Sequence, residues 1–502
     1  MDKGGVVRIL ALSGSALGLG LAAAPAHADT LQEALTDAYL NNPVLEAARA
    51  GQRATDENVQ IERASGLPSV EGNAAVTEFI KQRSTSFFQP QRALTAGVDL
   101  GVPIYSGGAV KNSVAAAKER VEAGRADLRG TESAIFTRVV AAYMDVLRGQ
   151  ALVSLSTNQV DVLGVNVQAT SDRFEIGDLT RTDVAQSQAR LALAQGDLRS
   201  AQANLIAARE DYIALVGEAP TNLQPPPPLP GLPESAEQAV DVALEDNPDL
   251  IAARERAAAA GYDIEVAGSS RLPRLSVFAG YDYDNYLGSI PDGRLDPTDP
   301  YSPVVPSAQT ATAASAGVSL RVPLFQGGRP AALQRQATAR ATAALEQVIA
   351  AERDVIAQVR SAYSSWQASL AIIESSQTAV SAAELSLEGV RAENSIGNRT
   401  ILDVLNAEQE LLQSRVQLVT ARRNAYVAGF SLLSAMGRAE ARDLGLGDEG
   451  VLYDPIDNYE RVSGSIWDWD RDPAPEASTS RTVDVPAQDA TIPAIEEQGV
   501  TP

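Results

Sequence analysis

Cysteine is absent from the 502 residues, and histidine occurs once, at His27. The lack of cysteine excludes thiol nucleophiles, disulfides and Cys-ligated metals. Acidic residues outnumber basic ones, with 64 Asp and Glu against 41 Lys and Arg and a net charge of −23. Because nucleic-acid binding requires clustered positive charge, no nucleic-acid partner is expected. The hydrophobic share of 45% is nevertheless that of a folded protein.

Residues 1–28 have the pattern of a secretory signal peptide. Lys3 and Arg8 precede an apolar run over residues 9–24, and Ala26-His27-Ala28 matches a small-residue cleavage site. We expect cleavage after Ala28, which removes the single histidine. Imidazole bases, Ser-His-Asp triads and His-ligated metals are then excluded as well. No glycine-rich phosphate or dinucleotide motif is present, so no cofactor is expected and the chain is not expected to be an enzyme.

The rest of the chain contains the same pattern twice. Asn42-Pro43 recurs as Asn247-Pro248 at an offset of 205 residues, and later matches have an offset of 220. A tandem duplication is therefore predicted, with a first repeat over 29–217, a proline-rich linker over 218–233 and a second repeat over 234–437. The later matches, all at the second offset, are Gly107-Gly108 with Gly327-Gly328, Tyr143 with Tyr363, Ile176-Gly177 with Ile396-Gly397, Asp183-Val184 with Asp403-Val404, and Gly217 with Gly437.

Each repeat follows one order of elements. A helix with Asn-Pro inside its early part is expected first, over 29–66 and 234–272. Two strands follow, then a very long helix, a short Ile-Gly turn and a last helix. The second repeat also has a long exposed loop over 288–307, rich in Pro, Asp, Gly and Ser. The expected strands are 69–79, 97–104, 275–283 and 317–325; the expected long helices are 108–174 and 328–392; the expected last helices are 182–216 and 402–436.

The expected strands alternate apolar and polar residues. Val98, Leu100 and Val102 share one face of their strand, whereas Asp99 and Gly101 share the other. This alternation is typical of a half-buried strand in a soluble sheet and also of a strand in a membrane barrel. The chain after residue 28 has no apolar run long enough for a spanning helix. If the strands lie in a membrane, four per chain are too few for a barrel, so several chains would have to contribute.

The last helix of the second repeat carries two heptad seams. One seam includes Leu405 and Leu412, and the other includes Val404 and Leu411. Two neighbouring seams predict a neighbouring helix on each side, as in a ring or sheet of helices, although a helix buried in an ordinary bundle remains an alternative. A helix of about 65 residues would reach about 100 Å. Two shorter helices stacked end to end could lie beside each long one.

The duplicated plan and the glycine turns resemble TolC-type outer-membrane channels over residues 29–437. The strand ends Val-Pro-(Ile/Leu)-(Tyr/Phe)-x-Gly-Gly also carry the likeness. The resemblance implies a mixed α and β membrane protein that forms a homotrimer. Four strands from each chain would make a twelve-stranded β-barrel in outer-membrane lipid, continuous with a long periplasmic α-helical barrel. The most specific motif is Ser395-Ile396-Gly397-Asn398-Arg399-Thr400-Ile401-Leu402-Asp403-Val404-Leu405.

The resemblance further implies an exit duct for proteins, toxins or drugs across the periplasm and the Gram-negative outer membrane. It would work without chemistry, gated at the helix turns and docked to an inner-membrane ABC, RND or similar transporter through a periplasmic adaptor (a membrane fusion protein). The docking turns would be Gly177, Asp178, Gly397 and Asn398. The sequence does not indicate the cargo.

The resemblance also places a pore constriction and a gate latch at these turns. Three copies of Asp403 would form an acidic ring, whereas Asn406 replaces the family's second acidic residue, which predicts weaker block by polyvalent cations. Without the resemblance, the position of Asp403 favours the simpler interpretation that it stabilises a helix N-terminus.

Arg399 would form the latch by pairing with Thr182 and Asp183. A second departure from the family is Asn394, which falls where the family has an aromatic latch partner.

The remaining segments have less pattern. Residues 438–470, with Trp467 and Trp469, are expected to pack around the waist of the helices, and the acidic tail 471–502 is expected to be disordered. A periplasmic adaptor and a structural coiled-coil protein remain alternatives, but an adaptor would have one hairpin instead of two repeats, and a coiled-coil protein would lack the strands. A glycosidase with paired carboxylates is chemically possible, but no order of elements supports a cleft.

Overall fold

The computed structural model describes residues 29–81, 90–294, 298–446 and 452–492, so the expected signal peptide lies outside the described residues. The same order of elements occurs twice. The first repeat contains α1 (Leu31–Asn41), α2 (Pro43–Ala64), β1 (Ser69–Glu78), β2 (Arg92–Tyr105), α3 (Ala109–Glu175) and α4 (Arg181–Val216). The second contains α5 (Ala236–Asp246), α6 (Pro248–Ser269), β3 (Arg274–Asn285), β6 (Thr310–Arg321), α7 (Arg329–Ser395) and α8 (Ile401–Ala435).

A small hairpin and two short helices complete the described chain. The hairpin of β4 (Gly293–Arg294) and β5 (Val304–Val305) lies in the long loop of the second repeat. After α8 come α9 (Pro455–Val462) and the 3₁₀ helix η1 (Thr482–Asp484).

The first helix of each repeat is broken in two, contrary to the single helix expected from the sequence. Asn42 has ψ of 121°, and its side chain accepts hydrogen bonds from the backbone N–H groups of Val44 and Leu45. The break follows because a residue before proline avoids the α region, while proline fits the first helical position. Asn247 does the same at the start of α6.

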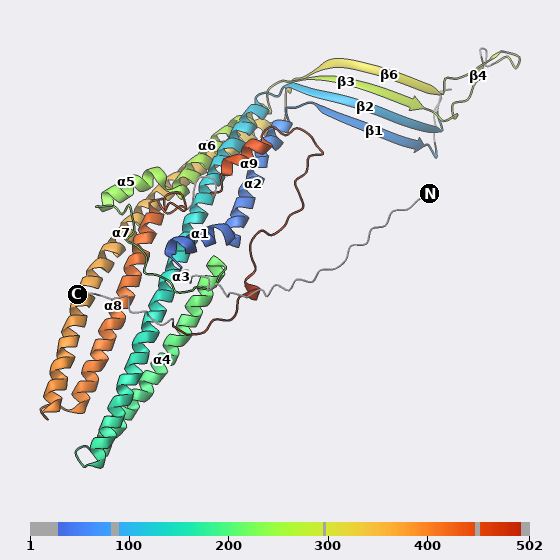
Figure 1. Cartoon of the computed structure of the whole chain (residues 1–502). Helices are drawn as coiled ribbons and strands as arrows, with labels where there is room; N and C mark the ends of the chain where they lie inside the picture. The colour runs from blue at the N-terminus through green and yellow to red at the C-terminus, as the bar shows by residue number, and fades with distance from the viewer. Residues whose placement is uncertain (1–28, 82–89, 295–297, 447–451, 493–502) are drawn as a thin grey trace, which may run out of the picture.

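The strands form one antiparallel sheet in the order β1-β2-β3-β6 (Figure 1). Its register aligns the apolar positions of the strands: Val70 lies opposite Leu100, Leu100 opposite Ala279, and Ala279 opposite Ala316. Because side chains alternate between faces, one face of the sheet is apolar and the other carries polar residues such as Asp99. The sheet therefore combines the four predicted strands into a single two-faced layer.

The strand expected over 317–325 instead begins at Thr310 and ends at Arg321. Pro323 explains the early end, since proline has no N–H to donate to a neighbouring strand. Leu324 and Phe325 beyond it are 92% and 89% exposed.

The helices lie side by side in one long layer that extends from the sheet (Figure 1). Helix α3 contacts α2 and α6 near the strands and contacts α4 and α8 further away, whereas α7 contacts α5, α6 and α8. The predicted stacking of two shorter helices beside each long helix is confirmed. One edge of the layer consists of α2 and α4, and the other consists of α7.

Helix α8 has a neighbour on each of its two seams, as the sequence predicts. Val404 and Leu411 pack in a cluster with Leu387 of α7. On the other seam, Leu405 packs with Leu163 of α3 and Ala194 of α4. Among the described residues, none of the helices combines the length and apolar character needed to cross a membrane.

The main hydrophobic core lies halfway along the layer and holds the linker in place. Phe136 and Tyr143 of α3 are fully buried there, together with residues of α1, α4 and α8. The Tyr143 hydroxyl donates to the backbone carbonyls of Gln224 (2.6 Å) and Asp29 (3.0 Å). Asp29, just before α1, and the proline-rich linker are thereby fixed to the middle of α3.

The segment after residue 438 only partly follows the expected packing at the waist. Ala439, Ala441 and Leu446 do join the main core. Helix α9, however, packs along α2, where Asn458 donates from its side chain to Asp56 (2.8 Å). Its amphipathic sequence and the polar side chains of α2 direct this part of the segment toward the strands.

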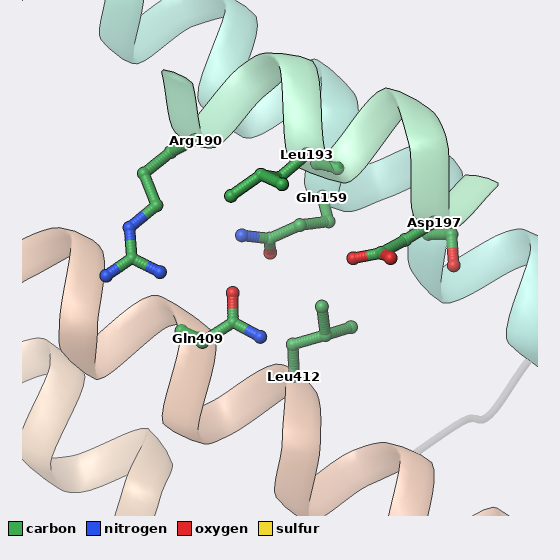
Figure 2. A pocket seen from close by; sticks show the side chains of 8 residues that line it. Gln159, Arg190, Leu193, Asp197, Gln409 and Leu412 are labelled. Atoms are coloured by element: carbon green, nitrogen blue, oxygen red, sulfur yellow. The ribbon is translucent and has the colours of Figure 1, made fainter. Parts of the chain in front are cut away.

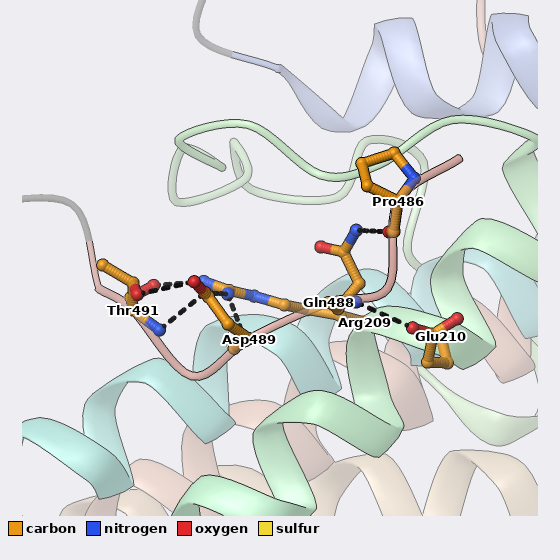
Figure 3. Close-up of polar contacts among 6 residues, drawn as sticks. All are labelled: Arg209, Glu210, Pro486, Gln488, Asp489 and Thr491. Carbon is orange, nitrogen blue, oxygen red and sulfur yellow. Dashed lines mark hydrogen bonds and ion pairs between the residues drawn. The ribbon is translucent and has the colours of Figure 1, made fainter. Parts of the chain in front are cut away.

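The tail is not disordered over its whole length. Arg209 of α4, whose side chain is 8% exposed, donates to the carbonyls of Asp489 (2.6 Å) and Thr491 (2.7 Å), as Figure 3 shows. Ala490 and Ile492 also pack against the main core. This stretch contacts α4 and the main core, although its composition predicts disorder, because the buried Arg209 side chain offers hydrogen-bond donors to its backbone carbonyls. Residues 493–502 lie outside the described chain.

Candidate functional site

The two helix turns have the same backbone geometry. Gly177 and Gly397 have φ of +84° and +85°, a conformation that favours glycine. In the first turn, the N–H groups of Gly177 and Asp178 donate back to the last carbonyls of α3, and in the second turn those of Gly397 and Asn398 donate to α7. This closure is a Schellman-type end that satisfies the free carbonyls of each long helix. All four predicted docking residues are thus exposed at the two tips.

Each turn ends in a capping box that involves the predicted acidic residue. Asp403 accepts hydrogen bonds from the backbone N–H of Thr400 (3.0 Å) and from its hydroxyl (2.7 Å), and Asp183 accepts the equivalent bonds from Thr180. These bonds lower the pKa of both aspartates below the usual value. Both carboxylates therefore stay ionised at neutral pH. The stabilising role at the helix N-terminus is realised in both repeats.

Each turn also contains an ion pair, but with the charges interchanged. Arg173 pairs with Asp178 at 2.7 Å in the first turn, where the acid follows the glycine. In the second turn Arg399 pairs with Glu393 at 2.7 Å, so the base follows the glycine. The two tips thus present different charge patterns on the same backbone.

The predicted latch is not formed within the single chain. Arg399 binds Glu393, and its carbonyl accepts a bond from the Asn394 side chain (2.8 Å). Asp183 binds Thr180 in its own turn, and Thr182 is exposed at the second position of α4. The structure brings Arg399 and Asn394 together but separates them from Asp183, because each side chain meets a closer partner in its own hairpin.

Asn406, the predicted second constriction residue, links the two hairpins instead. The Arg190 side chain on α4 donates to its side-chain oxygen at 3.0 Å. Arg190 also lines a cavity of about 250 Å³ between α3, α4 and α8 (Figure 2). In Figure 2, Arg190 and Leu193 of α4 face Gln409 and Leu412 of α8 across it.

Glu408 is a bridging residue that the sequence interpretation missed. It is 4% exposed on α8 and accepts hydrogen bonds from Asn166 of α3 (3.0 Å) and Arg391 of α7 (3.0 Å). The sequence does contain a signal for this contact, because the charged Glu408 directly follows Ala407, a small residue of a heptad seam. Glu408 therefore holds three helices together near the tips.

A second missed contact lies nearer the middle of the helices. Arg423 of α8 makes two hydrogen bonds to the Asp145 carboxylate of α3, at 3.1 and 2.7 Å. An arginine inside a heptad seam signalled such a partner, since a charge there must be paired. The two hairpins of one chain are thus joined at several levels.

The described tips combine helix-capping carboxylates with short exposed turns. Over the described ranges, no group of three His, Cys, Asp or Glu residues could hold a metal ion. The acidic side chains at the tips act as helix caps, and the turns themselves are exposed.

Comparison with known proteins identifies the family. The model of the outer membrane efflux protein family matches residues 34–218 and 239–438, which covers both repeats. The outer membrane efflux protein BepC of Brucella suis is 33% identical over 87% of this chain and 91% of its own length. The outer membrane protein TolC of Vibrio cholerae is 27% identical over 85% of this chain and 94% of its length.

Solved structures show the same fold. The outer membrane protein VceC of Vibrio cholerae matches with a TM-score of 0.68 and 24% identity over 81% of this chain and 96% of that chain. The CmeC outer membrane channel of Campylobacter jejuni matches with a TM-score of 0.69 and 16% identity, covering 86% and 89%. The chain belongs to the outer membrane efflux protein family and is an exit duct of the Gram-negative outer membrane that extends into the periplasm.

Proposed function

We propose that three copies of the chain assemble into one continuous passive channel. The observation that carries this proposal is the sheet, which has an apolar face and two edges, β1 and β6, without a strand partner in the described chain. Unpaired edges are too costly in lipid, so β6 of one copy would pair with β1 of the next. Three copies would then close a twelve-stranded barrel, the number that the family resemblance implies.

The helical layer supports the same assembly. Large apolar side chains on its edge helix α7 remain exposed, among them Leu345 (60%) and Leu385 (71%). On the opposite edge, Ile61 of α2 is 64% exposed. Contact between the α7 edge of one copy and the α2 and α4 edge of the next would cover these residues and close a tube.

Asp403 would line the narrow end of this tube. Symmetry would repeat its carboxylate three times around the axis, and the lowered pKa keeps each copy ionised. The ring would attract cations. Asn406 adds no charge there, and its bond to Arg190 engages its side-chain oxygen.

A latch between Arg399 and the Thr182–Asp183 pair would form between neighbouring copies. Formation of the latch would require Arg399 to leave its Glu393 partner, and opening would return Arg399 to Glu393. An exposed ion pair of this kind is weak enough for a docking protein to shift.

The turns would dock the periplasmic adaptor, and through it an inner-membrane ABC, RND or similar transporter. Ile176 and Ile396 support this, because both are exposed at the tips, at 81% and 71%. Relatives include an alkaline protease secretion protein of Pseudomonas aeruginosa and a cobalt-zinc-cadmium resistance protein of Cupriavidus metallidurans. Since such different systems share the fold, the transporter would select the cargo.

Cysteine cross-linking between the edge strands tests the assembly. Because the chain has no native cysteine, only the introduced cysteines can form disulfides. Val70→Cys on β1 should be combined in turn with Ala314→Cys, Ala316→Cys or Val318→Cys on β6. At least one pair should give covalent dimers and trimers on oxidation in membranes, whereas each single variant should give no trimer. Monomers alone with every pair would refute the proposal.

A further inference from the structure

Three large apolar residues are exposed in a folded loop after α9. Ile466, Trp467 and Trp469 are 75%, 71% and 72% exposed. Two exposed tryptophans so close together are unusual for a surface that faces only water, because tryptophan carries a large apolar ring that is normally covered. We refer to residues 466–469 as the tryptophan loop.

The tryptophan loop is held close to the base of the sheet. The side chain of Arg63 donates to the carbonyl of Ser463 (2.8 Å), and Gln60 donates to that of Ser465. Both donors lie in the last turns of α2, which ends at Ala64, and β1 begins at Ser69. In Figure 1, α9 accordingly lies beside α2 near the end from which the strands extend.

The loop has its own internal structure. The backbone N–H of Asp470 donates to the carbonyl of Trp467 (3.1 Å), and the Ser465 hydroxyl donates to the Asp470 carboxylate (3.2 Å). An ion pair between Arg461 and Asp472 at 2.9 Å closes the base of the loop. The tryptophans are therefore presented from a built turn and not from a loose chain.

The neighbouring strand ends expose aromatic residues at the same end of the sheet. Tyr105 at the end of β2 is 50% exposed, and Phe325 after β6 is 89% exposed. Membrane barrels carry such aromatic residues in a belt at the lipid interface, where a ring can be buried while its polar group stays in water.

We propose that the tryptophan loop docks on the phospholipid leaflet that faces the periplasm and extends this aromatic belt beyond the strands. The argument for lipid as the occupant is the continuity of the loop with the base of the sheet, and it rests on the proposed placement of that sheet in the membrane. Asp468 and Asp470 flank Trp469 and keep the loop at the depth of the headgroups, since carboxylates do not enter hydrocarbon. The loop thus anchors the C-terminal segment to the membrane surface without a lipid modification.

Tryptophan fluorescence provides a direct test, because the chain has only Trp366 besides these two. Trp366 lies on α7 against Tyr363, far from the strands, so Trp366→Phe leaves only the loop as a fluorophore. The protein is reconstituted into phosphatidylcholine vesicles with and without bromine on the acyl chains near the headgroup. The loop emission should lose about half its intensity with shallow bromine and less with bromine deep in the chains.

The matched control is the Trp467→Phe/Trp469→Phe variant, in which Trp366 should not be quenched. A second control places Val98→Trp, on the apolar face of β2, in a background with all three native tryptophans changed to Phe. If Val98→Trp is quenched and the loop is not, the loop proposal fails while the placement of the sheet stands. If neither is quenched, the proposed channel fails as well. Emission that is shifted to the blue but unaffected by bromine would indicate a protein partner and would also overturn the lipid assignment.

Discussion

Asp183 and Asp403 occupy equivalent positions in the two repeats and make the same hydrogen bonds. Each accepts from the backbone and the hydroxyl of a threonine three residues earlier. Their local chemistry is therefore matched, whereas their proposed positions in the assembled channel differ. Both aspartates cap a helix, but only Asp403 is proposed to line the pore. Comparing variants of the two therefore distinguishes the capping role from the effect of a charge in the pore.

Changing each aspartate to asparagine should affect stability alike but selectivity differently. Asp403→Asn should reduce the preference for cations in planar bilayers, while Asp183→Asn should leave the reversal potential unchanged. Because hydrogen bonding lowers the pKa of Asp403, wild-type selectivity should persist on acidification until the pH falls below the ordinary aspartate value of 3.8. Equal loss of selectivity in both variants would contradict a specific ring at Asp403.

Glu132 on α3 provides a prediction about pH. It accepts a hydrogen bond from the Ala441 backbone N–H (2.5 Å), and burial raises its pKa to about 7. The folded protein thus holds a proton that the unfolded chain releases near pH 4.5, so Glu132 costs stability progressively as the pH rises from 4.5 to 7. Nearby Glu440 and Asp443 add to this cost, whereas Arg49 opposes it.

Glu132→Gln should remove this pH dependence, because the amide oxygen can still accept the Ala441 bond. The variant should be more stable than the wild type at pH 8 by up to about 3 kcal/mol and equally stable below pH 4.5. Thermal unfolding followed by circular dichroism at both pH values is the measurement. A variant that is less stable at pH 8 would show that the ionised carboxylate is well accommodated.

At the level of elements, the breaks at Asn42 and Asn247 connect the start of each repeat to its end. The Asn42 side chain donates to the carbonyl of Leu215 at 2.9 Å, and Asn247 donates to that of Ala435 at 2.9 Å. Each asparagine therefore caps one helix at its N-terminus and satisfies a carbonyl at the C-terminal end of another. This double role requires an amide, which has both an acceptor and a donor.

Two substitutions at Asn42 should separate these roles. Asn42→Asp retains the cap but loses the donor, whereas Asn42→Ala loses both. The alanine variant should lower the unfolding free energy by about 2 kcal/mol, and the aspartate variant should retain part of the capping contribution. Urea unfolding of the two variants, with the same pair at Asn247, measures the difference. Identical values for Asp and Ala would mean that the cap contributes nothing.

The sequence predicted the elements better than their ends and connections. Heptad spacing correctly placed two neighbours beside α8, because a seam reflects the packing of the helix that carries it. The Asn-Pro break was missed because helix periodicity continues through it on both sides. Glu408 was missed because its partners Asn166 and Arg391 are on other helices, and a bond between them leaves no local pattern.

On the scale of the whole molecule, the C-terminal segment runs from the base of the sheet to the main core. It passes from α9 beside α2 to the contact with Arg209 on α4 (Figure 3). The segment thereby connects the end of the helices next to the sheet to their middle. The segment follows the second repeat in the chain, but it makes contacts to α2 and α4 of the first repeat.

Arg209→Ala should release the end of this segment. The carbonyls of Asp489 and Thr491 would lose their donor, and the burial of Ile492 would contribute only about 1.5–3 kcal/mol to holding it. Limited proteolysis should remove the C-terminal peptide several-fold faster than from the wild type. A truncation after Val485 is the control, and it should retain the helical content of the full chain. Equal cleavage of the variant and the wild type would show that the segment is not docked through Arg209.

By itself, the sequence determined the duplication, the order of elements, the two-faced strands and the glycine turns, because each of these depends on residues close together in the chain. Only the tertiary structure decided which strand edges stay open, how Arg190, Glu408 and Arg423 join the hairpins, and where the C-terminal segment lies. These features depend on side chains tens to hundreds of residues apart, and their hydrogen bonds exist only once packing brings the partners within reach.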